Sequence, residues 1–233
     1  SQEITNRVNR LRKFRKEPLL EFKPNFRYEL AKAKPYKGTR KNPKPFHFYN
    51  ILAHMEANYD LRIVEEGLEA DDAIGIEQMK NENTIICSRD KDLRMIPGNH
   101  FSWECGKQTA IGPITTDDLG WLDLVFKDVT RNGKPAKEKK ITGYGQKFFY
   151  FQMLAGDTVD NIPGLPGVGA VKAYDLINEV ESVEEAYTVV KDAYVEKLGH
   201  SVETKEYLFE QAGLLWIWRE NKPWTPPLKK EKE

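Results

Sequence analysis

The stretch Ala155-Gly-Asp-Thr-Val-Asp-Asn-Ile-Pro-Gly-Leu-Pro-Gly-Val-Gly-Ala-Val-Lys172 decides the fold of this chain. It contains two carboxylates, Asp157 and Asp160, which stand three residues apart after a segment rich in phenylalanine and tyrosine. Carboxylates this close repel each other unless a cation lies between them. We therefore expect the two acids to contribute to a cation site; the alternative interpretation is an ordinary turn with solvated acids.

A glycine-proline loop follows the two acids and precedes an amphipathic segment that carries Lys172. Gly164, Gly167 and Gly169 have no Cβ, so the backbone N–H groups around them can approach a phosphate closely. The N-terminus of the helix that follows adds its positive dipole end at the same place. The stretch therefore predicts a helix, a tight loop and a second helix, with neighbouring positions for a metal ion and a phosphate backbone.

The composition indicates a globular chain with a highly charged surface. Of its 233 residues, 39% are hydrophobic and 31% are charged. The sequence has no apolar run long enough to span a membrane, so we expect no membrane association. Cys87 and Cys105 lie in apolar, strand-like runs, which predicts buried thiols in a reducing, cytoplasmic setting.

The formal net charge is zero, but the charges are unevenly distributed along the chain. Residues 1–50 contain 14 Lys and Arg against 4 Asp and Glu, whereas residues 51–80 contain 2 against 8. A basic surface beside an acidic cluster is typical of a metal-dependent enzyme that acts on a polyanion. The alternative for any single charged run is a solvated face.

Hydrophobic periodicity and turn residues predict an α/β protein. We expect helices at about 1–16, 46–57, 69–77, 115–126, 146–155, 170–180, 183–198 and 202–220. Strands are expected at about 19–22, 61–65 and 84–88, with a strand pair at 100–105 and 108–111. Residues 127–142 are predicted to form a polar surface loop, and residues 221–233 a loose tail.

Seven carboxylates follow from this pattern as candidate metal ligands. They are Glu69, Asp71, Asp72, Asp90, Asp92, Asp157 and Asp160. They come from three segments that are each predicted to end at the same edge of a sheet, where ligand sites of open α/β folds gather. Oxygen ligands without a nearby His or Cys cluster indicate Mg²⁺ or Mn²⁺. Two such ions about 4 Å apart would clamp a phosphoryl displacement.

Five motifs resemble those of the structure-specific 5′-nucleases, a family of flap endonucleases and of 5′-nuclease domains of bacterial DNA polymerases. These motifs are Glu69-Ala-Asp-Asp72, Ser88-Arg-Asp-Lys-Asp92, the loop over 156–169, Asn25-Phe-Arg27 and Tyr36-Lys-Gly-Thr-Arg40. The last two resemble the bacteriophage 5′–3′ exonuclease branch. The resemblance implies a PIN-like fold, in which helices flank a central, mainly parallel sheet. It also implies a C-terminal helix-three-turn-helix over about 146–178 that grips duplex DNA, often with a bound K⁺.

The resemblance also implies a role for each matching residue. The first metal ion would be held by Glu69, Asp71 and Asp72, and the second by Asp90, Asp92, Asp157 and Asp160. The catalytic set would comprise Lys37, Arg40, Asp71, Asp72, Asp157 and Asp160. The DNA contacts would be Arg27, Tyr36, Lys37, Arg40, Gly164, Gly167, Gly169 and Lys172, with Tyr36 stacked on a terminal base.

We accordingly expect a single 5′-nuclease domain over 1–233, with a catalytic α/β part at about 1–126 and a helical DNA-binding part at about 141–220. Its expected activity is that of a 5′–3′ exonuclease or flap endonuclease on DNA, or on RNA in hybrids, with two Mg²⁺ or Mn²⁺ ions. The expected substrates are 5′ ends, flaps and nicks, bound by a monomer in the cytoplasm of a bacterium or of a phage-infected cell. The alternatives are a non-catalytic or weakly catalytic binder of branched or nicked DNA, and a PIN-domain ribonuclease, which the glycine-proline loop disfavours.

Two departures from the family pattern concern the first metal ion. Family members begin with an apolar strand that ends in Asp, and no such segment precedes Ser1. They also carry an Asp before the Phe-Arg motif, where this sequence has Phe22-Lys23-Pro24. We therefore expect either a fragment of a longer protein or a weakened first site. In addition, the 28 residues between Arg40 and Glu69 leave little room for a long helical arch.

Overall fold

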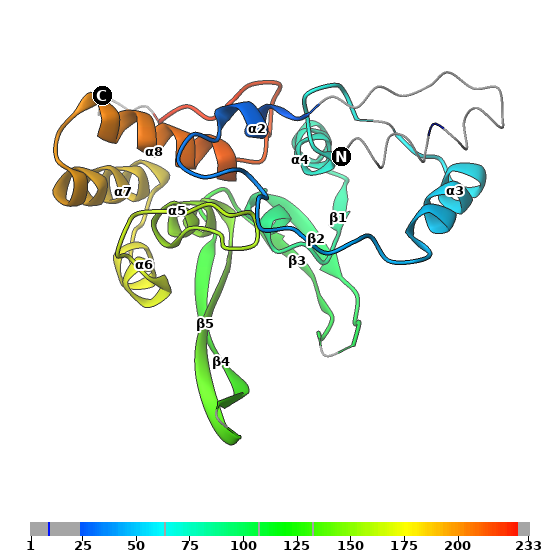
Figure 1. The fold of residues 1–233 in the computed structure, drawn as a ribbon, viewed down its shortest axis with the longest axis horizontal. Coiled ribbons are helices and arrows are strands. Elements are labelled where there is room, and N and C mark those ends of the chain that lie inside the picture. Colours follow the sequence, from blue (N-terminus) through cyan, green and yellow to red (C-terminus); the bar gives the residue numbers. More distant parts are fainter. Residues whose placement is uncertain (1–8, 10–23, 63, 107, 132, 228–233) are drawn as a thin grey trace.

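The computed structural model describes residues 9, 24–62, 64–106, 108–131 and 133–227, so the helix predicted at 1–16, apart from residue 9, and the strand predicted at 19–22 lie outside the described residues. Its elements are shown in Figure 1. The helices are α2 (Phe26–Leu30), α3 (Phe48–Asn58), α4 (Ala70–Lys80), the 3₁₀ helix η1 (Asp92–Met95), α5 (Gly145–Ala155), α6 (Ala170–Ile177), α7 (Val183–Leu198) and α8 (Val202–Leu215). The strands are β1 (Ile85–Cys87), β2 (Gly98–Ser102), β3 (Ile111–Thr116), β4 (Trp121–Arg131) and β5 (Lys134–Tyr144).

The protein is a mixed α/β fold, but its main sheet is smaller and less parallel than the resemblance implied. The three strands lie in the order β1-β2-β3, with β1 parallel to β2 and β2 antiparallel to β3. The predicted strand at 61–65 does not form in the residues described there. A mainly parallel sheet is therefore not confirmed, since the described strands contain one parallel pair.

Helix α5 forms the centre of the protein. From Phe148 to Leu154 every side chain is buried, and Phe149 and Tyr150 have no exposed surface. A helix that is apolar on all sides is stable only inside a core. The helices α6, α7 and α8 and the 3₁₀ helix η1 pack around it (Figure 1). The loop that follows α5 is therefore held by the most buried part of the chain.

Strands β4 and β5 form a long antiparallel hairpin where the sequence predicted a helix at 115–126 and a loop at 127–142. That prediction was wrong. In the sequence, Asn132-Gly133 stands between the two strands, and an Asn-Gly pair strongly favours the tight turn of a hairpin. Gly133 has a φ of +74°, which glycine adopts without strain. The hairpin projects away from the rest of the protein (Figure 1).

The described part of the predicted loose tail is anchored to the core. Trp224 is 7% exposed, and its ring lies 5.5 Å from that of Phe209, 5.8 Å from that of Tyr187 and 6.0 Å from that of Phe149. Burial of a large aromatic ring outweighs the turn-forming prolines around it. Helix α8 ends at Leu215, where Trp216 turns to an extended conformation, and not near residue 220 as predicted.

Two further expectations concern the thiols and the division of the chain. Cys87 and Cys105 are both exposed, contrary to the prediction, because β1 is short and Cys87 lies on its outer face. The division into a catalytic and a helical part stays a prediction. Within the described residues, no helix combines the length and the apolar character that crossing a bilayer requires.

Candidate functional site

Five of the seven candidate metal ligands line one small cavity of about 30 Å³. They come from the start of α4, the start of η1 and the loop between α5 and α6. The five acids are Glu69, Asp71, Asp92, Asp157 and Asp160. Leu214, Leu215 and Ile217, at and after the end of α8, also line the cavity. The carboxylates therefore meet in a partly apolar setting, where their repulsion is stronger than in bulk water.

One lysine neutralises the first pair of these acids. The ammonium of Lys37 lies 2.6 Å from Glu69 Oε1 and 3.9 Å from Asp160 Oδ2. Arg40 forms a second ion pair with Asp160. The Tyr36 hydroxyl donates to Glu69 at 3.0 Å and is 3.1 Å from Asp160 Oδ2. We call Lys37, Glu69 and Asp160 the Lys37 cluster.

A second lysine neutralises the other pair. The ammonium of Lys91 lies 2.7 Å from Asp92 Oδ1 and 2.5 Å from Asp157 Oδ2. Gln152, buried in α5, donates to Asp92 Oδ1 at 2.7 Å, and the backbone N–H of Val159 donates to Asp157 Oδ1 at 2.8 Å. Burial by itself lowers the pKa of Lys91. The charge of Asp92 and the hydrogen bonds to both acids raise it by more than that, so the pKa lies above its ordinary value. We call Lys91, Asp92 and Asp157 the Lys91 cluster.

Asp71 carries the clearest sign of excess negative charge. Burial raises its pKa to about 6, and the charges of Asp90 and Glu69 act in the same direction. Asp90 itself is exposed, and it accepts the backbone N–H of Asp92 at 3.0 Å, which fixes the chain after β1. A bound cation would offset both the cost of burying this carboxylate, which is the larger cause, and its repulsion by the two neighbouring acids.

A divalent metal ion fits this site by the chemistry of its donors and by the position of the two ammonium groups. Carboxylate oxygens are the ligands that Mg²⁺ and Mn²⁺ prefer. Each lysine places a positive charge between two carboxylates, as a metal ion would. Among the described residues, no three acidic, histidine or cysteine side chains are already grouped to hold an ion. An ion therefore requires the lysines to turn away, and the side chain of Lys91 is 41% exposed.

The structure shows Arg27 and Asp72 as a buried ion pair, and the DNA contact and metal ligand that the resemblance implied stay predictions. Asp72 has no exposed surface and Arg27 is 2% exposed. The guanidinium donates two hydrogen bonds of 2.7 Å to the carboxylate of Asp72. It also donates to the carbonyls of Leu214 and Trp216, at 3.1 and 2.7 Å. The pair joins α2, α4 and the end of α8, and Arg27 also lines the cavity of the acids, 3.6 Å from Glu69 Oε2.

Tyr36 also lines the cavity but is largely enclosed, and its stacking on a terminal base stays a prediction. It is 4% exposed, and its ring lies edge-on against Tyr28 at 5.4 Å. Burial and the charges of Glu69 and Asp160 raise its pKa, so the hydroxyl remains a donor to the two acids. Its role in this structure is to orient the acids of the Lys37 cluster, and the exposed ring of the pair is Tyr28, at 47%.

The glycines of the loop between α5 and α6 serve two different purposes. Gly164 is buried, and its N–H donates to Gln211 at 3.0 Å while its carbonyl accepts from Tyr207 at 2.7 Å. A Cβ at this position would collide with the backbone nitrogen of Gly156. The N–H of Gly164 is therefore used inside the fold and is not available to a phosphate.

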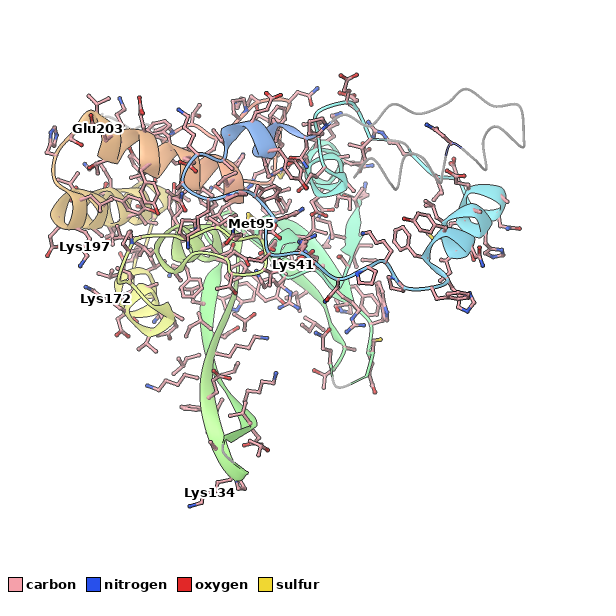
Figure 2. All side chains as sticks on the ribbon, in the orientation of Figure 1. Lys41, Met95, Lys134, Lys172, Lys197 and Glu203 are labelled. Carbon is pink, nitrogen blue, oxygen red and sulfur yellow. The ribbon has the colours of Figure 1, made fainter. Side chains whose placement is uncertain are left out.

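Gly167 and Gly169, by contrast, are exposed at the N-terminus of α6. A Cβ on Gly169 would meet no atom within 4 Å, so nothing inside the fold requires a glycine there. Lys172 is exposed in the first turn of α6, and the ammonium of Lys197 lies about 3.5 Å from a Cβ built on Gly167. Figure 2 shows both lysines on the outer side of these helices. We call Gly167, Gly169, Lys172 and Lys197 the α6 patch.

The sequence analysis missed three residues of these sites: Lys91, Gln152 and Lys197. Lys91 stands between two candidate ligands, so its neighbours Asp90 and Asp92 were a signal for it. Gln152 and Lys197 had no comparable signal, because helices α5 and α7 bring them into place.

Between the basic motif that ends at Arg40 and the acidic motif that begins at Glu69, the described residues contain one short helix. Helix α3 has 11 residues, none of them buried, and lies away from the core (Figure 1).

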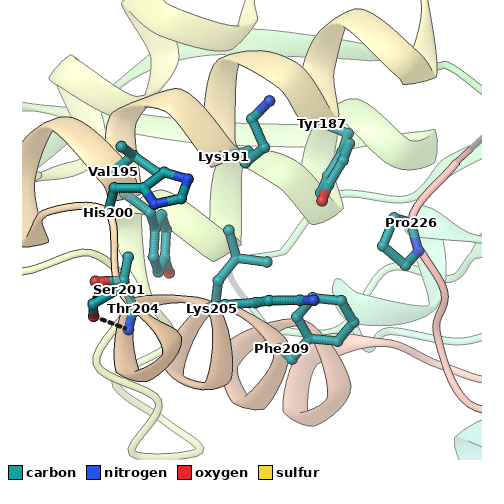
Figure 3. Close-up of a pocket in the computed structure, with 11 residues that line it drawn as sticks. Tyr187, Lys191, Val195, His200, Ser201, Thr204, Lys205, Phe209 and Pro226 are labelled. Carbon is teal, nitrogen blue, oxygen red and sulfur yellow. Dashed lines mark hydrogen bonds between the residues drawn. The ribbon is translucent and has the colours of Figure 1, made fainter. Parts of the chain in front are cut away.

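A separate cavity of about 320 Å³ lies between α7 and α8, where Ser201 accepts the N–H of Thr204 at 3.1 Å (Figure 3). None of the candidate site residues lines this second cavity.

Comparison with known proteins gives one family match and several relatives. Residues 144–217 match the family model described as 5′–3′ exonuclease, C-terminal SAM fold. DNA polymerase I of Rhizobium leguminosarum is 29% identical over 177 residues, which are 71% of this chain and 15% of the polymerase. Flap endonuclease Xni of Shewanella halifaxensis is 28% identical over 163 residues, which are 66% of this chain and 56% of that enzyme.

A solved structure of T5 5′-exonuclease with bound zinc aligns over 92% of this chain and 80% of its own, with a TM-score of 0.49 and 18% identity. The chain thus spans less than two thirds of the length of the two curated relatives.

Proposed function

The chain is a relative of the 5′–3′ exonucleases and flap endonucleases, and from this relationship we propose that it is a divalent-metal-dependent nuclease that hydrolyses DNA near 5′ ends. The observation that carries the proposal is the pair of lysine-bridged acid clusters at one cavity. Carboxylates from three chain segments meet there, and besides their local hydrogen bonds they share the two ammonium groups. Their convergence is explained by a cationic ligand.

The acids of each cluster would hold one metal ion. Glu69, Asp160 and the neighbouring Asp71 would serve the first ion, and Asp92 and Asp157 the second. Bound Mg²⁺ or Mn²⁺ would supply Lewis-acid stabilisation of the phosphate and an activated water. Both roles depend on the carboxylates being fixed, and the hydrogen bonds of Tyr36, Gln152 and the loop backbone provide that.

Lys37 and Arg40 would act on the phosphate itself. Both cations now pair with acids of the cavity. When a metal ion neutralises those acids, the two side chains are free to pair with the phosphate of the substrate. Their charge would then offset negative charge that develops on the phosphate oxygens.

The α6 patch would hold the duplex beside the cleavage site. Exposed N–H groups at a helix N-terminus and two nearby lysines form an anion-binding surface. We place the K⁺ of the helix-three-turn-helix resemblance at the loop before α6. The substrates proposed are 5′ ends, flaps and nicks of DNA, or RNA strands in hybrids, bound by a monomer in the cytoplasm.

The second candidate is a binder of branched DNA without efficient cleavage. One observation favours it. Both carboxylate oxygens of Asp72 accept hydrogen bonds from Arg27, so the first metal site has one ligand fewer. This candidate predicts duplex binding through the α6 patch without metal-dependent cleavage.

Metal-dependent cleavage by the parent chain separates the two candidates, and substitution of the loop acids tests the metal site. Asp157→Asn and Asp160→Asn should lower single-turnover cleavage of a 5′-flap substrate by about 10²-fold or more, because each removes a charge that holds a metal ion. Duplex binding should persist. Asp192→Asn is the matched control, since this acid is exposed on α7 and pairs only with Lys191 among the ion pairs of the described residues. Unchanged cleavage in both loop variants would reject the proposed metal site.

A further inference from the structure

The β4–β5 hairpin extends far from the core (Figure 1). The strands are paired in register from Trp121↔Tyr144 to Arg131↔Lys134. Eleven residues at about 3.4 Å each give a ribbon about 35 Å long. Between 125 and 140, every side chain that the structure describes is exposed or half-buried. We call residues 125–140 the distal arm; Figure 2 shows Lys134 at its tip.

The base of the hairpin is rigid, so the arm has a fixed direction. The ring of Trp121 stacks on that of Tyr144 at 4.7 Å. Arg94 donates to the hydroxyl of Thr142 at 3.2 Å and lies 5.6 Å over the Tyr144 ring. Gly120 has a φ of +69°, and a Cβ on it would collide with the Tyr144 carbonyl. An arm anchored in this way is a built element rather than a slack connection.

The charges of the arm divide into balanced and unbalanced lysines. The register places Lys137 opposite Asp128 and Lys127 opposite Glu138, so these lysines have acidic neighbours. Three other lysines have no acid directly opposite, although Asp128 and Asp123 lie diagonally across from Lys139 and Lys140. Lys134 is opposite Arg131, Lys139 is opposite Phe126 and Lys140 is opposite Val125.

This pattern does not stabilise the hairpin by itself. An isolated two-stranded ribbon is marginal in water, and like charges directly opposite each other destabilise it. Phe126 is 60% exposed beside Lys139. Lysines also protect exposed strand edges from aggregation, but that purpose does not require six basic residues against two acids over residues 125–140. A polyanionic partner accounts for all three unbalanced positions.

The hairpin starts beside helix α6, whose N-terminus carries the α6 patch. Strand β5 and helix α6 are in contact, and in Figure 1 the hairpin leaves the protein next to α6. From Val125 to Arg131 the arm reaches about 20 Å further, which is the length of about six base pairs of duplex. The major groove, about 12 Å wide, admits a two-stranded ribbon.

We infer that the distal arm is a second DNA-binding element, which contacts the phosphate backbone of the duplex through Lys134, Lys139 and Lys140. The inference rests on the proposed function, because it places the duplex at the α6 patch. The arm would lengthen the contact with the double-stranded part of the substrate and would take no part in bond cleavage. Its contacts would be to phosphates and therefore independent of base sequence.

The test compares two triple variants of the full chain. Lys134→Gln/Lys139→Gln/Lys140→Gln removes the unbalanced charges of the arm. Lys191→Gln/Lys205→Gln/Lys222→Gln removes three charges from α7, α8 and the segment after α8. Circular dichroism checks that both variants remain folded. Fluorescence anisotropy then measures binding to flap substrates whose duplex part is either about six or about twenty base pairs long, across a range of salt concentrations without divalent ions.

The arm variant should bind the long duplex at least about tenfold more weakly and lower its salt slope by about three units, one for each lost phosphate contact. On the short duplex its affinity should stay close to that of the parent chain. Equal affinity and salt slope for the arm variant, the control variant and the parent chain on the long duplex would overturn the inference, as would an equal loss on both lengths. These readouts do not involve cleavage, so the metal site and the arm can fail independently.

Discussion

The buried pair of Arg27 and Asp72 allows a sharp test of whether Asp72 is structural. Asp72 accepts two hydrogen bonds of 2.7 Å from Arg27, one of 2.9 Å from the N–H of Glu69 and one of 3.0 Å from the N–H of Trp218. Arg27→Met would remove the only cation that faces this carboxylate among the ion pairs of the described residues. Breaking a buried ion pair on one side costs about 3–5 kcal/mol.

That loss corresponds to a fall in melting temperature of about 6–20 °C, at about 2–4 °C per kcal/mol for a chain of this size. Circular dichroism melts and urea titrations would measure it. Arg62→Met is the control, because Arg62 and Glu77 form an exposed ion pair that contributes at most about 1 kcal/mol. Arg27→Met/Asp72→Asn should recover part of the loss, since no uncompensated charge remains buried. A loss below about 1 kcal/mol, or a salt slope for DNA binding that falls by about one unit, would refute the structural role.

Three further predictions follow from individual contacts. Lys91→Met should tighten the binding of Mn²⁺ in a calorimetric titration without DNA, because no ammonium then competes for the two acids; unchanged affinity would mean that the lysine does not occupy the ion's place. Gly169→Val should leave the melting temperature close to that of the parent chain and weaken duplex binding, whereas Gly164→Ala should destabilise the fold by collision with Gly156; a gel-shift titration in which Gly169→Val binds normally would remove this glycine from the DNA contact. His100 is 5% exposed and burial lowers its pKa, so the unfolded chain binds protons more readily and stability should fall as the pH drops below about 6.5; His100→Gln should flatten that part of a stability profile, and an unaltered profile would contradict the assignment.

The helices around the loop could be predicted because their ends are encoded locally. Helix α7 has the predicted bounds, 183–198, since the side chain of Ser182 accepts the N–H of Glu185 at its start and Gly199 adopts a φ of +87° after its end. The many Phe and Tyr residues of α5 likewise predicted a helix in the core. Signals of this kind lie within a few residues of the structure that they determine.

The hairpin was missed although its signal was present. Asn132-Gly133 lies between two segments that contain β-branched residues, but the polar, basic composition of 127–142 is also typical of a surface loop. The predicted helix at 115–126 was wrong for a different reason: Asp117 and Asp118, which would suit the start of a helix, also favour a turn.

The roles of the buried site residues depended on contacts that local sequence does not contain. Arg27 meets Asp72, 45 residues away, and the carbonyl of Leu214, 187 residues away. Tyr36 reaches Asp160 across 124 positions. In a charged segment, a basic or aromatic residue is typical of a ligand contact. Which of these side chains are enclosed follows from the packing of α8 against α2.

The central claim, that the lysine-bridged acids are sites for catalytic metal ions, is tested most directly by cleavage of a 5′-end-labelled flap substrate in a titration of Mg²⁺ and of Mn²⁺, with EDTA as the zero point. The account predicts no cleavage in EDTA, cleavage that rises to a plateau with either ion, and products released from the 5′ end. Cleavage in EDTA at the rate seen with Mg²⁺ would contradict it. Normal duplex binding without cleavage at any concentration of either ion would also contradict it and would favour the non-catalytic binder.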